Sequence, residues 1–268
     1  MKHKSLFLSL LLVFCLVLAG CGADATAPSE AGSDAQKLTM KLGHYDEDHA
    51  PVMVDTEVLY TGELVEGVAE GEGSFTAKGS NGMDITYTGS FKNGVPSGFG
   101  CTVWASEDEV YLEEGTYRNG LYLPTPSEMI ASLGKTDLAL DKFTLSEGAS
   151  AFISEHLALF PTINANAAAQ APHIELDVNA LTEATNEFES GLTELTDLTV
   201  QSSSSYFYGG ITVNVILAAD ADQNLIAVYY PGKMECAEGD VFASVHALPL
   251  ASFTEGTARL AVLASTIG

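Results

Sequence analysis

Cys21 is the residue of this sequence whose surroundings most clearly indicate a chemical modification. Residues 1–21, MKHKSLFLSLLLVFCLVLAGC, combine a basic start, an uncharged apolar run from Leu6 to Leu18, and small residues directly before the cysteine. These are the features of a secretory signal peptide. The apolar run is shorter than the ~20 residues that cross a bilayer, which disfavours a permanent membrane helix. We therefore expect residues 1–20 to be removed as a signal peptide.

The Leu-Ala-Gly-Cys ending at Cys21 resembles the lipobox of bacterial lipoproteins. This resemblance implies that the Cys21 thiol carries a lipid such as palmitate and that Cys21 is the first residue of the mature chain. Plain secretion and an uncleaved anchor are the alternatives. The expected location is the extracytoplasmic face of a bacterial cell membrane, with the lipid as the only membrane contact.

Two other patterns match known motifs only in part. The segment Asp220–Asn224 resembles the opening of a calcium loop, but Leu225 and Pro231 occupy the positions that require Gly and Glu. A β-turn is therefore expected there. Ser132 and Lys135 spell the S-x-x-K of penicillin-recognising enzymes, but the Ser-Asp-Asn and Lys-Thr-Gly motifs of those enzymes are missing. We interpret this match as a coincidence.

The histidines show no spacing typical of a zinc site or a catalytic triad. Outside the signal peptide, which contains His3, they are scattered at His44, His49, His156, His173 and His246. The acidic segment 45–49 can hold a metal ion, although a solvated loop is the preferred interpretation. We expect no catalytic residues, no metal and no cofactor, and an enzyme of unrecognised type remains a distant alternative.

Charge excludes one large class of partners. The 268-residue chain carries 11 basic and 36 acidic residues, and removal of Lys2 and Lys4 leaves a formal charge of −27. Nucleic acids and anionic lipid headgroups need clustered Lys and Arg, so neither is expected as a partner. Cys101 and Cys236 are far apart in sequence, and whether they form a disulfide stays open.

The first part of the mature chain is predicted to be a spacer. Residues 22–37 are small, polar and rich in Pro and Gly, which is typical of a flexible linker. Short apolar stretches between residues 38 and 58 indicate edge strands. We define residues 21–50 as a lipidated tether with an acidic loop.

A repeated pattern begins at Tyr60 and continues to about residue 123. Its glycines at 62, 89 and 115 are nearly evenly spaced, and each is followed by a turn dipeptide typical of a β-hairpin. The three copies are Tyr60-Thr-Gly62-Glu-Leu64-Val-Glu-Gly67-Val-Ala-Glu-Gly71-Glu-Gly73, Tyr87-Thr-Gly89-Ser-Phe91-Lys-Asn-Gly94-Val-Pro-Ser-Gly98-Phe-Gly100, and the truncated Gly115-Thr-Tyr117-Arg-Asn-Gly120-Leu. The paired glycines 71/73 and 98/100 are predicted to leave room for an aromatic ring of a neighbouring hairpin.

The spacing and residue pattern of these copies resemble MORN repeats. The third copy lacks the leading Tyr and the final glycines, and Leu64 replaces a usual aromatic residue. The resemblance implies a stack of β-hairpins over residues 51–123, with a role in interaction or scaffolding. Phospholipid binding, proposed for some such repeats, is disfavoured by the acidic surface. Tyr60 and Tyr87 are expected mainly to pack the stack.

Residues 124–175 are predicted to form a short helical connector. Ser127 is expected to cap a helix ending at Ser132, and Ser146 to cap a second helix that stops at Pro161. Residues 162–174 are expected to be a surface linker. Asp177 is expected to cap one more short helical stretch.

Residues 176–268 contain the signals of five short antiparallel strands, and therefore predict a small Greek-key barrel. The strands are placed near 193–201, 210–218, 224–230, 240–246 and 257–264, with the serines 202–205 as a turn. This part of the chain resembles OB-fold modules of Firmicute surface proteins (the tRNA-anticodon-binding-like group). The resemblance lies in the residue pattern from Ile226 to Lys233, in the Gly239-Asp240 dipeptide before a strand, and in the last apolar strand.

In such barrels, the second and third strands and two loops bind ligands. The candidate binding residues in this registration are aromatic, namely Tyr206, Phe207, Tyr208, Tyr229 and Phe253. Their rings can stack on a sugar-like ligand, or can simply close the ends of the barrel. Between residues 201 and 268 only Lys233 and Arg259 are basic, which again argues against nucleic acid. The sequence thus predicts a mainly β, lipid-anchored protein that recognises an envelope protein. Binding of a cell-wall sugar by the barrel is the alternative.

Overall fold

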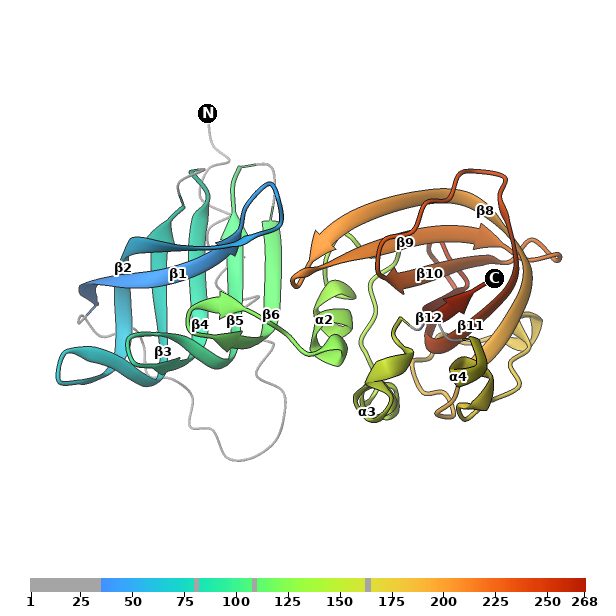
Figure 1. The fold of residues 1–268 in the computed structure, drawn as a ribbon, viewed down its shortest axis with the longest axis horizontal. Helices are drawn as coiled ribbons and strands as arrows, with labels where there is room; N and C mark the ends of the chain where they lie inside the picture. Colours follow the sequence, from blue (N-terminus) through green and yellow to red (C-terminus); the bar gives the residue numbers. More distant parts are fainter. Residues whose placement is uncertain (1–34, 80–81, 108–109, 162–164) are drawn as a thin grey trace. The chain divides into compact units, whose positions relative to one another are not determined.

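The computed structural model describes residues 35–79, 82–107, 110–161 and 165–268. The fold is mainly β: a seven-stranded sheet is followed by three short helices and a closed five-stranded barrel (Figure 1). The predicted signal peptide and the lipidation site at Cys21 lie outside the described residues. The predicted fold class, a hairpin stack joined by helices to a C-terminal barrel, is confirmed.

The sheet consists of consecutive antiparallel hairpins in chain order from β1 to β7. Its side chains alternate between a buried face and an exposed face, as the period-2 pattern of β4 shows. The strands are β1 (Gln36–Tyr45), β2 (Pro51–Val65), β3 (Val68–Lys78), β4 (Asp84–Lys92), β5 (Val95–Ala105), β6 (Val110–Arg118) and β7 (Leu121–Tyr122).

Each tight turn of the repeat has the predicted turn geometry. Asn93 and Gly94 both adopt positive φ, of 52° and 83°, as a two-residue hairpin turn requires. The amide of Gly94 also donates to the carbonyl of Ala69 at 3.0 Å, and the amide of Gly120 donates to the carbonyl of Pro96 at 2.8 Å. Successive turns are therefore joined by one equivalent backbone hydrogen bond per repeat.

The paired glycines make room for tyrosine rings, but not in the predicted way. A Cβ on Gly73 would lie 2.7 Å from the hydroxyl oxygen of Tyr60, and a Cβ on Gly100 would overlap Tyr87 in the same manner. Each ring thus packs on a glycine of its own hairpin, not of a neighbouring one. Its hydroxyl donates to a backbone carbonyl three residues ahead, at 3.0 Å in both repeats.

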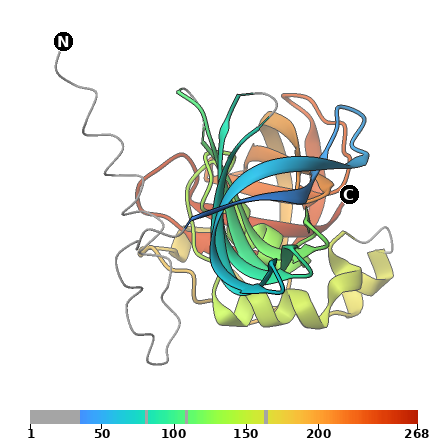
Figure 2. The ribbon, with the colours of Figure 1, turned by 90° about the vertical axis from the view of Figure 1, so that its left-hand side faces the viewer.

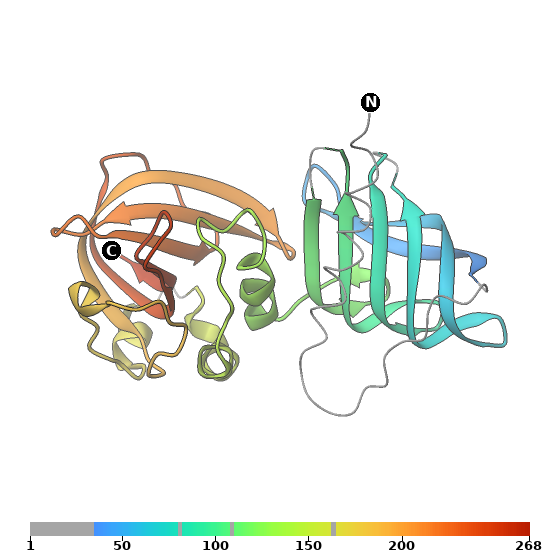
Figure 3. The same ribbon diagram turned by 180° about the vertical axis from the view of Figure 1, so that it is seen from behind.

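The sheet begins earlier than expected. The sequence predicts a boundary at residue 51, with a tether and loop over residues 21–50, although it indicates edge strands from residue 38. In the structure β1 pairs with β2 from Gln36 onward. Figures 1 and 3 show β1 and the first half of β2 running across the other strands. The amide of Gly43 donates to the carbonyl of Gly120 at 2.8 Å, so β1 contacts the last hairpin of the sheet as well as β2. Figure 2 shows the resulting curl of the sheet.

The helical connector packs on the barrel. It contains α2 (Pro126–Leu133), α3 (Glu147–Glu155), the 3-10 turn η1 (Leu157–Leu159) and α4 (Ala165–Gln170). Ile130 of α2 and Ile153 of α3 are fully buried in the same apolar cluster as barrel residues such as Leu263. The connector is therefore part of the core of the C-terminal half of the chain.

One predicted helix cap is wrong and two are confirmed. Thr125, not Ser127, caps α2. Its side chain accepts a hydrogen bond from the Glu128 amide, and the Glu128 carboxylate accepts one from the Thr125 amide. Pro126 favours this start because it fits the first helical position. Ser146 caps α3 as predicted, and the Asp177 side chain caps the short 3-10 turn η2 (Val178–Ala180).

The barrel strands follow the order β10-β12-β11-β8-β9 and close on themselves. β10 and β12 pair in parallel, and the other neighbouring pairs are antiparallel. The strands are β8 (Thr193–Tyr208), β9 (Ile211–Ala219), β10 (Leu225–Pro231), β11 (Val241–Ser252) and β12 (Leu260–Ile267). All five predicted strands are present.

The predicted turn at residues 202–205 is wrong. Ser202–Ser205 continue β8 and pair with residues 214–217 of β9, and the chain instead reverses at Gly209 and Gly210. Pairing with an apolar partner strand outweighs the turn preference of serine. Cys101 lies on β5 of the sheet, whereas Cys236 packs against an apolar cluster of the barrel, and the structure forms no disulfide between them.

Candidate functional site

Two of the predicted binding residues, Tyr208 and Tyr229, have structural roles. Tyr208 ends β8, and its hydroxyl lies 2.5 Å from the carbonyl oxygen of Leu112 and 2.6 Å from the hydroxyl of Ser132. It therefore connects the barrel to β6 and to α2. Tyr229 is fully buried on β10, and its hydroxyl accepts the amide of Leu140 at 3.1 Å. Burial raises the pKa of both phenols.

The other three predicted residues are half-buried. Tyr206 on β8 and Phe253 after β11 both pack against the apolar cluster shared by the helices and the barrel. Phe207 instead contacts the β1–β2 hairpin: its ring stacks on His49 with 3.8 Å between centroids and meets Tyr45 edge-on at 5.1 Å. The structure thus does not gather these aromatic residues at a single mouth of the barrel.

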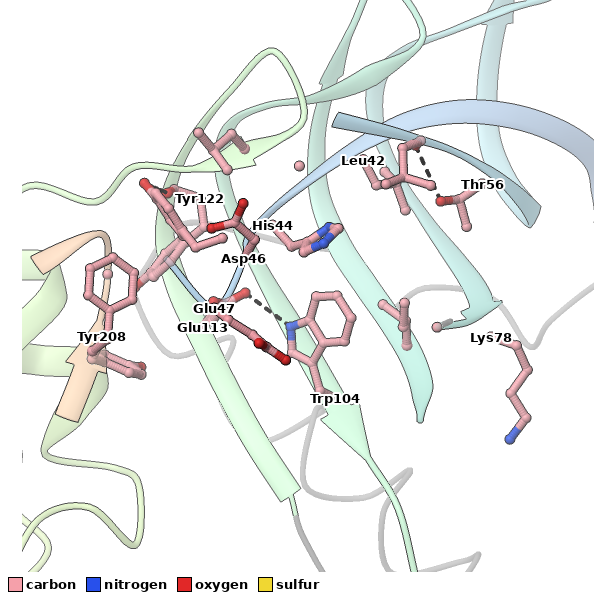
Figure 4. A pocket seen from close by; sticks show the side chains of 18 residues that line it. Leu42, His44, Asp46, Glu47, Thr56, Lys78, Trp104, Glu113, Tyr122 and Tyr208 are labelled. Carbon is pink, nitrogen blue, oxygen red and sulfur yellow. Dashed lines mark hydrogen bonds between the residues drawn. The ribbon is translucent and has the colours of Figure 1, made fainter. Parts of the chain in front are cut away.

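A pocket of about 590 Å³ opens on the curved face of the sheet (Figure 4). This volume is in the range of sites for small organic ligands. Most of its lining comes from the sheet, and the end of β8 with the following glycine completes it. The lining residues are Leu42, Gly43, His44, Tyr45, Asp46, Glu47, Val54, Thr56, Lys78, Gly79, Ile85, Trp104, Glu113, Leu121, Tyr122, Phe207, Tyr208 and Gly209. We call this the sheet pocket.

A carboxyl group and an indole ring form the polar centre of the sheet pocket. Trp104 on β5 donates from Nε1 to Oε2 of Glu113 on β6, at 3.0 Å (Figure 4). The second carboxyl oxygen, Oε1, has no hydrogen-bond partner among the described residues. Burial raises the pKa of Glu113, and the hydrogen bond from Trp104 opposes that shift in part. One side of the carboxyl group is therefore left for a ligand.

Tyrosine side chains surround Glu113. The negative charge of Glu113 contributes to raising the pKa values of Tyr45, Tyr117, Tyr122 and Tyr208, after the larger effect of burial. These phenols therefore stay protonated and neutral at physiological pH. Only their electric dipoles and ring faces act on a group in the pocket.

Glu113 stands where the earlier repeats have a buried tyrosine. It precedes Gly115 by two residues, as Tyr60 precedes Gly62 and Tyr87 precedes Gly89. The return strand of the third hairpin, β7, is only two residues long and provides no glycine to receive a ring. Tyr122 takes part of that space and donates its hydroxyl to the carbonyl of Glu114 at 3.1 Å.

The rim of the pocket is acidic and partly apolar. Asp46 and Glu47 line it from the β1–β2 turn, where Oδ1 of Asp46 accepts the amides of Asp48 and Ala50 at 3.0 and 2.9 Å. This geometry fits the preferred interpretation of the acidic segment as a solvated turn. The ammonium group of Lys78 lies 2.7 Å from Asp84 and is therefore already paired.

With this geometry established, the repeat can be compared with known protein families. Residues 60–80 and 87–109 match the MORN repeat family. These segments contain the two complete copies of the repeat that precede Glu113. No curated protein and no solved structure matches the chain.

The two partial motifs of the sequence have structural roles. Asp220 uses Oδ1 to accept the amides of Asp222 and Asn224 at 2.9 and 2.8 Å, as expected for a turn. The Ser132 hydroxyl contacts Tyr208, and Lys135 forms an ion pair with Glu114. Within the described residues, no three His, Cys, Asp or Glu side chains form a metal-binding group, and no helix is long and apolar enough to cross a membrane.

The sequence prediction missed Trp104 and Glu113, although it included Phe207 and Tyr208, which also line the sheet pocket. A signal for Glu113 was present in the sequence. The missing leading Tyr of the third repeat is the position of this glutamate, so aligning the repeats places a carboxyl group on their buried face. Trp104 has no comparable repeat signal.

Proposed function

We propose that this chain is a lipid-anchored, extracytoplasmic binding lipoprotein, and that the sheet pocket is its recognition element for an envelope protein. The observation that carries this proposal is the pocket itself. It combines a volume suited to an organic group, several aromatic rings, and a carboxyl oxygen to which no described residue donates a hydrogen bond.

An exposed apolar residue extends the pocket toward a protein partner. Val54 on β2 lines the sheet pocket and keeps 42% of its surface exposed. Apolar side chains next to a pocket are a common feature of protein interfaces. A partner can therefore insert one side chain into the pocket while its surrounding surface covers Val54.

The C-terminal barrel is proposed to be of the OB type. In support, β8, β9 and β10 form consecutive antiparallel pairs, β12 joins β10 in parallel, and β11 closes the barrel onto β8. This is a Greek-key arrangement of five strands. Arg259 donates from Nε to the carbonyl of Val178 at 3.0 Å, so one of the few basic groups of the barrel is already engaged.

A sugar-like ligand on the barrel is the second candidate. It is favoured by Tyr206 and Phe253, which are half-buried on one apolar cluster and keep part of their rings accessible. Aromatic faces of this kind can stack on the apolar face of a sugar ring. Tyr208 and Tyr229 form structural hydrogen bonds. This barrel site therefore has fewer rings for a ligand than the sequence indicates.

Photo-crosslinking in intact cells tests the partner proposal. A photoreactive phenylalanine analogue at position 54 should give a discrete protein adduct. The same group at position 241 is the matched control, because Val241 is also an exposed strand valine, on the barrel. Identical adduct patterns from the two positions, or no adduct from position 54, would contradict recognition through the sheet pocket.

Metabolic labelling with a clickable fatty acid tests the anchor separately. The wild-type chain should incorporate the label and fractionate with membranes, whereas Cys21→Ser should lose the label and keep its fold. Equal labelling of the two proteins would exclude Cys21 as the lipidation site.

A further inference from the structure

The chemical groups of the sheet pocket favour one class of ligand. Aromatic rings of Trp104 and Phe207 line it together with three tyrosines, and the faces of such rings attract cations. Three carboxylate side chains share the lining, whereas its one ammonium group, that of Lys78, is paired with Asp84. An anion would be repelled by these carboxylates, and a neutral apolar ligand would gain nothing from them.

We propose that the sheet pocket binds an alkylammonium group, with its positive nitrogen near Oε1 of Glu113 and its alkyl groups against the ring of Trp104. This inference rests on the proposed function, because it assigns a ligand to the pocket that we propose as the recognition element. The group can belong to a small organic molecule or to a lysine side chain of a partner.

The position of Glu113 explains why a cation is needed. Its carboxyl group lies on the buried face of the repeat, at a position where the first two repeats bury a tyrosine. Trp104 bonds only one of the two oxygens. Glu113 is half-buried, and a carboxylate at such a position is costly unless a positive partner is near it, which a bound ammonium group supplies.

A bare metal ion fits the pocket less well than an organic cation. Calcium requires six to eight oxygen ligands in a compact shell. Within the described residues no group of three suitable side chains is close enough to hold a metal ion, and Oδ1 of Asp46 already accepts two turn amides. Aromatic walls favour an organic cation, whose alkyl groups contact the ring faces, over a strongly hydrated metal ion.

Trp104 allows a direct test because it is the only tryptophan of the chain. The full chain in detergent is titrated with choline and with n-butylammonium, and the fluorescence of Trp104 is followed at constant ionic strength. The control ligand is 3,3-dimethylbutan-1-ol, which has the shape of choline without its charge. Calcium chloride is the second control. Choline represents a small quaternary ligand, and n-butylammonium represents a lysine side chain.

We expect saturable binding of at least one of the two ammonium compounds, with the neutral alcohol weaker by about tenfold or more. Saturation by the alcohol at equal concentrations would overturn the proposal. Saturation by calcium alone would also overturn it, and so would the failure of both ammonium compounds to saturate the fluorescence change.

Glu113→Gln then tests the assigned carboxylate. The change keeps the shape of the side chain and an acceptor for Trp104, and it should weaken ammonium binding by about tenfold. Glu155→Gln, on the exposed surface of α3, removes the same charge outside the pocket and should leave binding unchanged. Equal weakening by both changes would show a general charge effect and overturn the assignment.

This experiment can fail independently of the crosslinking test. Ammonium binding without an adduct at position 54 would retain the ligand chemistry and reject the envelope protein partner. An adduct without ammonium binding would retain the partner and reject the ligand chemistry.

Discussion

Glu113 occupies in the third hairpin the position that Tyr87 occupies in the second. Each residue precedes a glycine by two positions, Gly115 and Gly89, and each faces the buried side of the sheet. Tyr87 fills its space with a ring whose hydroxyl donates to Ser90, while Glu113 leaves a pocket and holds Trp104 by one hydrogen bond. A single exchange in the repeat thus changes a packing position into a candidate binding position.

Glu113→Gln should raise stability at neutral pH. Burial raises the pKa of Glu113, so the folded chain holds this proton more tightly than the unfolded chain does. The stability of the wild type therefore falls as pH rises from the usual Glu value of ~4.3 through the folded-state pKa, because ionisation then opposes folding. Glutamine does not ionise, and the surrounding phenols stay protonated in this range because their pKa values are raised.

Thermal melts of the wild type and of Glu113→Gln across a pH series measure this effect. The variant should melt higher at pH ~7, and the difference should shrink as pH falls toward ~4. Other carboxyl groups titrate in both proteins, so the difference isolates Glu113. A variant that melts lower than the wild type at neutral pH would contradict the argument.

Gly94→Val should destabilise the sheet by about 1–3 kcal/mol. Gly94 has a φ of 83°, which a β-branched residue adopts only with strain, and a Cβ there would lie 3.2 Å from Cγ1 of Val68. Chemical denaturation monitored by circular dichroism provides the measurement. Gly148→Ala is the control, because Gly148 is helical, alanine is favoured in helices, and the atom nearest the new Cβ, at 3.2 Å, is the end of the flexible Ser190 side chain. An unchanged denaturation midpoint for Gly94→Val would show that this turn carries no strain.

Tyr208→Phe should cost about 1–2 kcal/mol. The change removes the hydroxyl that contacts the carbonyl of Leu112 and the side chain of Ser132, and it leaves the Leu112 carbonyl without that donor. Tyr206→Phe is the matched control, two residues earlier on β8, where the structure shows no hydrogen bond from the hydroxyl to any described residue. Equal denaturation midpoints for the two variants would exclude Tyr208 as a structural connection.

The double change Tyr206→Ala with Phe253→Ala separates binding from packing in the barrel. If these rings stack on a sugar-like ligand, binding of cell-wall fragments should weaken by ~1–3 kcal/mol for each ring lost, with little loss of stability. If they only pack, the melting temperature should fall and binding should not change. NMR titration of the wild type and the variant with cell-wall fragments, together with thermal melts, distinguishes the two outcomes.

The sequence by itself determined the local elements of this protein. The period-2 alternation around Tyr60 and Tyr87 and the turn dipeptides such as Asn93-Gly94 specified the hairpins, because strand and turn preferences act over a few neighbouring residues. For the same reason, the cap at Ser146 and the five barrel strands were predictable, although their ends were not. Ser202–Ser205 belong to β8 because they pair with β9, and that partner lies beyond any local window.

Only the tertiary structure decided the candidate site. The sheet pocket exists because β1 returns across the sheet to bond Gly43 to Gly120, residues far apart in the sequence. The same curl brings Tyr45 beside Phe207, while the β5–β6 pairing places Trp104 close enough to bond Glu113. Repeat spacing identifies the face of the sheet on which Glu113 lies. The curl of the sheet determines which residues lie opposite Glu113 across the pocket. That curl results from many weak contacts between distant strands, and no short segment of the chain encodes it.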